Sequence, residues 1–263
     1  PVIVTFEPYP MEFFAPERAP ARLTDFRQKL ELLSVLGVDK VICLRFNESL
    51  ASVTAQAFVE DVLVRKLNVK GLIVGEDFRF GNNREGNIDL LRKMSEKNKF
   101  ELIPAETFHY NGKRVSSSLV RGHLAIGDFN LVRELLGRPY RIDGTVIHGD
   151  KRGRELGYPT ANIACRRVNY PLSGVFVVRI HGLNDTIHDG VASIGTRPVF
   201  DGEDMLLEVN LFDFQQDIYG KRISVEFCKK LRDEQQFHSV EALCEQMATD
   251  VKKSREYFLK NMS

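Results

Sequence analysis

The segment 149–162 has the residue types of a loop that holds nucleotide phosphates. Glycines recur every four residues, at Gly149, Gly153 and Gly157, and the cations Lys151 and Arg154 lie between them. Glycine lets backbone N–H groups approach an anion closely, and the cations attract polyphosphate. The spacing differs from that of a P-loop, which requires a Gly-x-x-x-x-Gly-Lys-Ser/Thr run. From composition alone, a solvated basic turn explains the segment as well as a phosphate site does.

Two oxygen donors close this segment, in the run Pro-Thr-Ala-Asn. The hydroxyl of Thr160 and the carboxamide of Asn162 are hard ligands of the kind that magnesium accepts together with phosphate and water. Thr160 and Asn162 are therefore the candidate metal ligands.

Glu208 is the candidate proton acceptor. In residues 206–211 the side chains of a strand alternate, so Leu207 and Val209 share one face while Glu208 and Asn210 share the other. A carboxylate in that position can reach an alcohol that is to be phosphorylated. The alternation alone favours the simpler interpretation, a strand glutamate that faces solvent.

The elements that position these residues fall into two patterns. Up to about residue 135, short apolar runs alternate with helical spacing, which favours parallel strands joined by crossover helices. The expected strands are 2–6, 40–45, 71–74 and 100–103, with helical patterns near 26–37, 58–69 and 87–97. This rhythm predicts a doubly wound α/β domain.

From Pro139 onward the chain reads as an all-β domain. Short strand-like runs at 144–148, 175–180, 190–194, 206–211 and 223–227 are separated by turn residues, as in a small closed barrel. Apolar residues between Val240 and Phe258 recur at helical spacing and predict a terminal helix packed on the barrel. Gly137 and Pro139 interrupt the preceding helical pattern, so the expected domains are 1–137 and 138–263.

Composition limits the classes of protein to consider. The 263 residues are enough for two medium domains. Lys and Arg number 37 against 36 Asp and Glu, so no bulk attraction to nucleic acid or membrane is indicated. Four scattered cysteines and the lack of a long apolar run favour a cytoplasmic protein with reduced thiols. The sequence carries no signal for an oligomeric state.

Several ordered motifs of the second half resemble the riboflavin kinase domain of bacterial riboflavin kinase/FAD synthetases. They are Gly153-Arg154-x-Leu156-Gly157-x-Pro159-Thr160-Ala161-Asn162, Gly190-Val191-Ala192-x-Ile194-Gly195-Thr196-Arg197-Pro198, Leu207-Glu208-Val209-x-Leu211, Asp217-Ile218-Tyr219-Gly220 and Leu231-Arg232-x-Glu234-x-x-Phe237. Asn210 stands where many members of the family have His, and Val199 where they usually have Thr.

The resemblance implies a role for each matched residue. Glu208 would be the catalytic base, Thr160 and Asn162 would bind magnesium and the phosphates of ATP, and the 149–157 loop would cover the nucleotide. Arg232, Glu234 and Phe237 would lie near the flavin. For Arg232 alone, a surface salt bridge would be the default explanation.

The first half resembles the FMN adenylyltransferase domain of the same enzymes, a Rossmann-like nucleotidyltransferase. The matching residues are Thr5-Phe6-Glu7-Pro8-x-Pro10, Val74-Gly75-x-Asp77-Phe78-x-Phe80-Gly81 and Val115-Ser116-Ser117-Ser118-x-Val120-Arg121. Glu7, Pro8, Asp77 and Phe78 follow expected strands, where ligands of open α/β sheets bind. Ser117, Ser118 and Arg121 would hold ATP phosphate at a helix start, although Ser116 or Ser117 also reads as an ordinary helix cap.

One family signature, Gly-x-Phe-Asp-Gly-x-His-x-Gly-His, does not occur in this sequence, and the family carries it upstream of the Thr-Phe-Glu-Pro strand. Because Pro1 opens directly into an expected strand, we expect an upstream segment beyond this sequence. The resemblance then implies two reactions that require magnesium: phosphorylation of riboflavin by ATP, giving FMN and ADP, and adenylylation of FMN by ATP, giving FAD and pyrophosphate. The alternatives are a riboflavin kinase with an inactive first domain and a flavin-binding regulator without catalysis.

Overall fold

The structure is a computed structural model that describes residues 1–149, 153, 156–164, 170–184, 186–199 and 202–261. Side chains between 196 and 205 lie outside that description. Contacts between Cα atoms divide the chain into two compact units, Pro1–Pro20 with Leu33–Val115 and Ala21–Leu32 with Ser116–Ser263.

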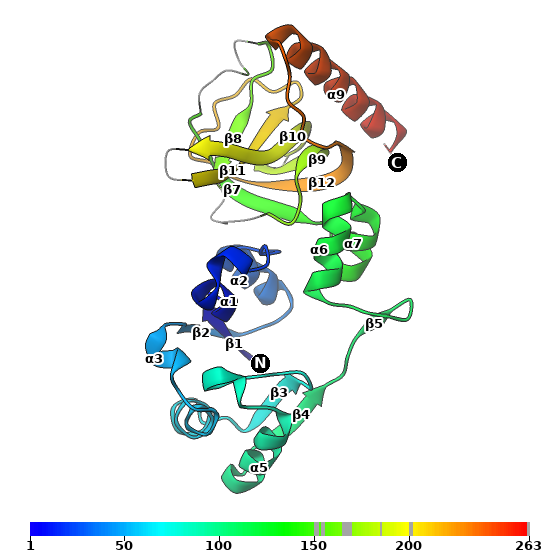
Figure 1. The fold of residues 1–263 in the computed structure, drawn as a ribbon. Helices are drawn as coiled ribbons and strands as arrows, with labels where there is room; N and C mark the ends of the chain where they lie inside the picture. Colours follow the sequence, from blue (N-terminus) through cyan, green and yellow to red (C-terminus); the bar gives the residue numbers. More distant parts are fainter. Residues whose placement is uncertain (150–152, 154–155, 165–169, 185, 200–201, 262–263) are drawn as a thin grey trace. The chain divides into compact units, whose positions relative to one another are not determined.

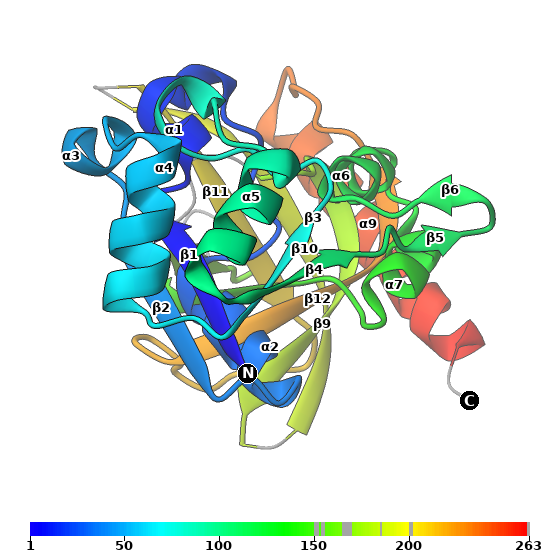
Figure 2. The same cartoon turned by 90° about the horizontal axis from the view of Figure 1, so that it is seen from below.

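The first unit contains two pairs of parallel strands (Figures 1 and 2). β1 (Val2–Glu7) pairs with β2 (Lys40–Arg45), and β3 (Gly71–Gly75) pairs with β4 (Glu101–Ala105). The four expected strands and their parallel direction are therefore confirmed. The other elements up to residue 115 are α1 (Pro10–Phe14), η1 (Pro16–Arg18), α2 (Phe26–Val35), α3 (Glu48–Ala51), α4 (Ala55–Ala57), η2 (Phe58–Lys66), η3 (Asn82–Arg84), α5 (Ile88–Asn98), β5 (His109–Tyr110) and β6 (Lys113–Arg114).

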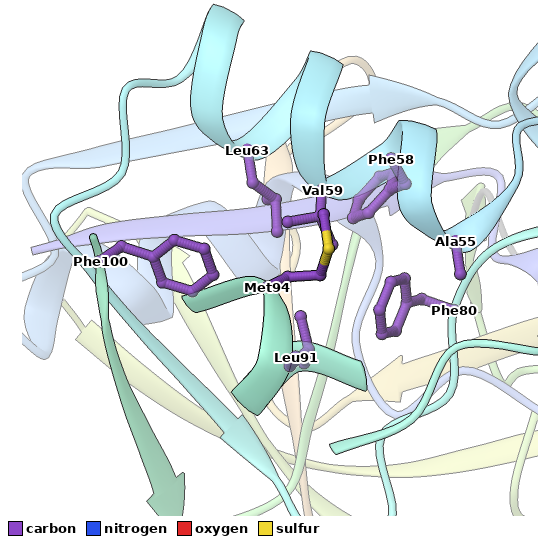
Figure 3. Close-up of a cluster of buried hydrophobic side chains, with 8 residues drawn as sticks. All are labelled: Ala55, Phe58, Val59, Leu63, Phe80, Leu91, Met94 and Phe100. Carbon is purple, nitrogen blue, oxygen red and sulfur yellow. The ribbon is translucent and has the colours of Figure 1, made fainter. Parts of the chain in front are cut away.

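The core of this unit lies between α4, η2 and α5, whose apolar side chains point toward one another in Figure 3. η2 has a wider turn than an α-helix, because the N–H of Leu67 donates to the carbonyl of Val62, five residues earlier. This turn explains why the apolar residues of 58–69 follow α-helical spacing only loosely. The buried members of the core are Ala55, Phe58, Val59, Leu63, Phe80, Leu91, Met94 and Phe100.

The second unit contains a closed barrel with the strand order β10-β11-β8-β7-β12-β9. The predicted barrel and its five expected strands are confirmed, and Figure 1 shows the strands together with α9. The sixth strand, β8, falls in the Pro-Thr-Ala-Asn segment, which was expected to be part of a loop. The strand bounds are β7 (Arg141–Ile147), β8 (Ala161–Ala164), β9 (Gly174–Leu183), β10 (Thr186–Val199), β11 (Gly202–Leu211) and β12 (Arg222–Arg232).

Helices α6 (Ser117–Ile126), α7 (Phe129–Leu136) and α9 (Val240–Lys260) belong to the same unit, as do residues 26–32 of α2. The terminal helix was predicted, and it packs on the barrel through Phe258, which is buried together with Val177 and Phe212. The carboxamide of Gln28 also binds the barrel, donating to the carbonyl of Arg141 at 3.1 Å. Because residues 21–32 and 116–137 group with the barrel by contact, a domain boundary between 137 and 138 stays a prediction.

Candidate active site

A cavity of about 430 Å³ opens in the second unit between the barrel strands and α9. Its lining comes from segments far apart in the sequence, because β8, β10, β11 and the residues that follow β12 all reach it. The predicted site residues that line it are Gly153, Thr160, Asn162, Glu208, Arg232, Glu234 and Phe237. The barrel therefore brings together residues that the sequence predicted to bind the nucleotide, to bind the flavin and to accept the proton.

Glu208 and Asn162 are direct cross-strand neighbours in this cavity. β11 and β8 are antiparallel, and the register pairs Glu208 with Asn162. The flanking residues Leu207 and Val209 are fully buried in the barrel, whereas Glu208 is half-buried and lines the cavity. The alternation of residues 206–211 is therefore confirmed, and Glu208 lies at the cavity rather than on an open solvent face.

Two glycines allow the loop to approach the oxygen donors closely. A Cβ atom on Gly149 would overlap the carboxamide of Asn162. One on Gly153 would overlap the backbone carbonyl of Tyr158 and lie 3.1 Å from the hydroxyl of Thr160. At Gly157 the backbone has φ +83°, a left-handed conformation that glycine adopts without strain. Lys151 and Arg154, both predicted to bind ATP, lie outside the described residues.

Asn210 fixes the backbone that leads into Thr160. Its side-chain N–H donates to the carbonyl of Pro159 at 2.8 Å, and the residue is only 8% exposed. This hydrogen bond satisfies a side-chain N–H of the buried Asn210. The residue that departs from the family pattern thus has a defined contact beside the site.

Arg232 lies in a set of contacts that joins β12 to α9. Its Nε donates to Oδ2 of Asp250 at 2.9 Å, and its guanidinium carbon is 5.7 Å from the centre of the Phe237 ring. Asp250 is 3% exposed, so this pair is not a surface salt bridge. Nearby, loss of hydration raises the pKa of the Glu234 carboxyl, and the charge of Arg232 opposes that shift.

A second hollow of about 400 Å³ lies beside the first and shares Thr160 with it. Phe214 and Tyr219 give it aromatic walls, and Pro159 and Ala161 line it from the segment around Thr160. The backbone N–H of Tyr219 donates to the carboxylate of Asp217 at 3.0 Å, which fixes the turn beside the hollow. Thr160 therefore stands where two spaces of substrate size meet.

In the first unit, the expected ligand residues follow the strands. Glu7 ends β1 and Pro8 follows it, while Asp77 and Phe78 follow β3. Asp77 lines a hollow of about 390 Å³ with Arg114, whose guanidinium donates to the carboxylate at 2.7 Å and lowers the pKa of Asp77.

The predicted phosphate residues of the helix start belong to the second unit. Ser116 caps α6 by accepting a hydrogen bond from the N–H of Leu119, so Ser117 and Ser118 occupy the first turn. The Nε of Arg121 donates to the carbonyl of Ala21 at 2.6 Å. The cap interpretation therefore holds for Ser116, and the hydroxyls of Ser117 and Ser118 are not the capping group.

Comparison with known proteins places the chain in a family. Residues 136–258 match the family model described as riboflavin kinase, and residues 1–119 match the model described as FAD synthetase. The chain is 46% identical over 257 residues to the bifunctional riboflavin kinase/FMN adenylyltransferase of Escherichia coli (strain K12), covering 98% of this chain and 82% of that protein. The chain belongs to this family. The protein of the same name from Haemophilus influenzae is 42% identical over 256 residues, covering 97% and 83%.

A solved structure shares the fold along nearly the whole chain. It is described as a macrolide-efflux protein from Streptococcus pneumoniae, with a TM-score of 0.76 and 31% identity over 97% of this chain and 83% of that one. That description concerns the Streptococcus pneumoniae protein. In the part of this chain that the structure describes, no helix has the length and apolar character needed to cross a membrane.

Sequence reasoning missed some residues of the larger cavity. Asp250, which lines the cavity, was not identified because an acid on a helix usually faces solvent. A signal was present, since Leu243 and Met247 precede Asp250 by seven and three residues and place it on the apolar face of the helix. Among the described residues no group of three His, Cys, Asp or Glu side chains is arranged to hold a metal.

Proposed function

We propose that the second unit phosphorylates riboflavin with ATP to give FMN and ADP. One observation carries the proposal: Glu208 and Asn162 are cross-strand neighbours on a cavity wall, beside the point where Thr160 joins two hollows. Phosphoryl transfer needs an acceptor and a donor held on either side of one point. The family relationship supplies the identity of the two substrates.

In this proposal the larger cavity holds riboflavin and the second hollow holds the nucleoside of ATP. The flavin ring lies toward the apolar and aromatic wall that includes Phe237, and its 5′-hydroxyl points to Glu208. The hydroxyl oxygen attacks the γ-phosphorus as its proton passes to the carboxylate of Glu208, and ADP leaves. Thr160 lies between the two spaces and orients the transferred phosphoryl group.

The donor set near Glu208 suits magnesium. Thr160 and Asn162 offer neutral hard oxygens, and the backbone approaches Asn162 closely at Gly149 and Thr160 closely at Gly153. Magnesium bound there would neutralise charge on the phosphates of ATP. Gly157, Lys151 and Arg154 belong to the same proposed nucleotide loop, and Arg232, Glu234 and Phe237 to the flavin side.

We assign adenylylation of FMN, with release of pyrophosphate, to residues 1–137, and the kinase to residues 138–263. Glu7, Pro8, Asp77 and Phe78 follow strand ends, where ligands of α/β sheets bind, and Ser117, Ser118 and Arg121 lie at a helix start suited to phosphate. The family relationship supports this second activity. We assign both reactions to the cytoplasm, where ATP is available, and expect magnesium to be required for each.

The test incubates the chain with riboflavin, ATP and magnesium and separates the flavin products by chromatography. We expect FMN to form, and the isosteric change Glu208→Gln to lower kcat by about 100-fold or more because the proton acceptor is lost. Thermal unfolding of both proteins controls for folding. A folded wild type that binds flavin without forming FMN would instead support the non-catalytic alternative.

A parallel sample of the complete gene product tests FAD formation. FMN and FAD from that sample support the bifunctional assignment, whereas FMN without FAD favours a kinase whose first domain is inactive. Chelation of magnesium with EDTA should stop product formation in either sample, and activity that persists without divalent cations would contradict the proposed cation site.

A further inference from the structure

One wall of the larger cavity comes from the terminal helix rather than from the barrel. Leu243, Met247, Asp250 and Val251 of α9 line it, at spacings of four, seven and eight residues that define a single helix face. Three of these residues are apolar, and the fourth is a carboxylate. A charged group on an apolar helix face is costly unless its partner is close.

The partner of Asp250 is Arg232. Two guanidinium nitrogens, Nε and Nη2, each lie 2.9 Å from Oδ2 of Asp250, and the side-chain exposures are 19% for Arg232 and 4% for Asp250. The other carboxylate oxygen, Oδ1, accepts a hydrogen bond from Gln246 at 2.9 Å. Both oxygens of Asp250 are thus bound, and the carboxylate fixes the direction of the guanidinium.

The fixed guanidinium lies against an aromatic ring. Phe237 is 5.7 Å from the guanidinium carbon, and its ring and Arg232 both line the cavity. A planar cation paired with an aromatic ring presents flat surfaces that suit stacking with a planar aromatic ligand. Such stacking requires the guanidinium to stay in one orientation, because a freely rotating arginine side chain would have to be ordered when the ligand binds.

We infer that Asp250 is a positioning residue for the planar ring of the flavin, acting through Arg232 and Phe237. The inference rests on the proposed kinase function, because it assigns the flavin ring to this cavity. The inference gives Asp250 no role in binding the phosphates or in accepting the proton at Glu208. Loss of Asp250 should therefore weaken riboflavin binding and leave phosphoryl transfer within the bound complex nearly unchanged.

The test is Asp250→Asn, which keeps the shape and removes the charge. Asp213→Asn is a matched control, because Asp213 binds Arg255 of α9 at 2.8 and 2.9 Å while Arg255 lies 4.6 Å from the Phe212 ring. This second pair also joins α9 to the barrel, but neither Asp213 nor Arg255 lines the cavity. The two variants thus each remove an Arg–Asp contact between α9 and the barrel, one at the cavity and one at a more exposed pair, with 48% and 77% exposure for Arg255 and Asp213.

For Asp250→Asn we expect the KM and the Kd of riboflavin to rise about tenfold, with kcat and the KM of ATP within about twofold of wild type. Flavin fluorescence gives the Kd, and the rate of FMN formation gives the kinetic constants. Asp213→Asn should leave all four values unchanged. If both variants shift the melting temperature and neither shifts the riboflavin constants, Asp250 is structural only and the inference fails.

A second variant keeps the inference testable if Asp250→Asn does not fold. Gln246→Ala removes the partner of Oδ1 and leaves the ion pair, so it should raise the riboflavin Kd by about threefold. An unchanged Kd for Gln246→Ala in that case would overturn the inference. A wild-type protein that forms no FMN would instead refute the kinase proposal, so the two failures are distinguishable.

Discussion

Single residues around Thr160 show how the site depends on close backbone approach. A Cβ on Gly149 would overlap Asn162, and one on Gly153 would overlap the carbonyl of Tyr158 close to Thr160. Asn210 binds the carbonyl of Pro159, just before Thr160. These contacts fix the donors in place before any ligand binds. A preorganised site of this kind avoids ordering its groups at the moment of reaction.

Asn210→Ala tests that preorganisation. The change removes the hydrogen bond to the carbonyl of Pro159, and a bond of this kind contributes about 0.5–1.5 kcal/mol to stability. Because Pro159 precedes Thr160, we expect the KM of ATP to rise several-fold with a smaller change for riboflavin. Steady-state kinetics with each substrate varied in turn measures the difference.

Asn210→His supplies the control, since His is the residue that many family members carry there. A histidine can also donate a hydrogen bond, so this variant should stay close to wild type in the KM of ATP. An unchanged KM of ATP for Asn210→Ala would show that the contact with Pro159 does not matter for the nucleotide.

A site residue could be predicted from the sequence only where the pattern of its own strand or helix determines its position. Glu208 was located correctly because strand alternation determines its face, whatever its role. Asp250 was missed because its significance comes from Arg232, which precedes it by 18 residues and reaches it only when α9 packs on the barrel. Sequence periodicity gives the face of a helix but not the element that the face meets.

At the scale of elements, β8 marks the limit of strand prediction. It has four residues, Ala161–Ala164, and follows a proline, so it lacks the length and alternation of a recognisable strand. It exists because β7 and β11 both pair with it and the barrel closes through it. Tertiary pairing therefore determines this element, whereas α9 was predictable from its own apolar face.

Ser239→Ala tests the contribution of α9 as an element. Ser239 caps the helix by accepting a hydrogen bond from the N–H of Ala242 at 3.1 Å. Loss of this cap should lower the free energy of unfolding by about 1 kcal/mol. Because Leu243 and Met247 in the first turns line the cavity, fraying there should also raise the Kd of riboflavin. Denaturant unfolding and flavin fluorescence measure the two effects.

Ser239→Asp tests whether helix capping, and not another property of the serine, accounts for the effect. Aspartate is as good a capping residue and its charge is favourable at a helix N-terminus, so stability and riboflavin binding should both return to wild type or better. A Ser239→Asp protein as impaired as Ser239→Ala would indicate that the hydroxyl acts in another way.

At the scale of the whole molecule, each compact unit has its own buried core. The first is built around Leu91 and Val59, and the second lies within the closed barrel. The residues proposed for the kinase come from the barrel strands, the segment between β7 and β8 and the segment after β12, and none of them is among those assigned to adenylylation. The two reactions should therefore be separable by mutation, even though one reaction makes the substrate of the other.

The prediction concerns the complete gene product, assayed with riboflavin and with FMN as alternative starting flavins. Glu208→Gln should lose FAD formation from riboflavin but keep it from supplied FMN, because adenylylation does not use that carboxylate. The double change Ser117→Ala and Ser118→Ala removes two hydroxyls from the proposed phosphate site and leaves the cap of Ser116 intact. It should lower FAD formation about tenfold or more and leave FMN formation unchanged. If Glu208→Gln also abolished adenylylation of supplied FMN while remaining folded, the two sites would not be independent, and a catalytic dependence between the units would have to replace the modular assignment.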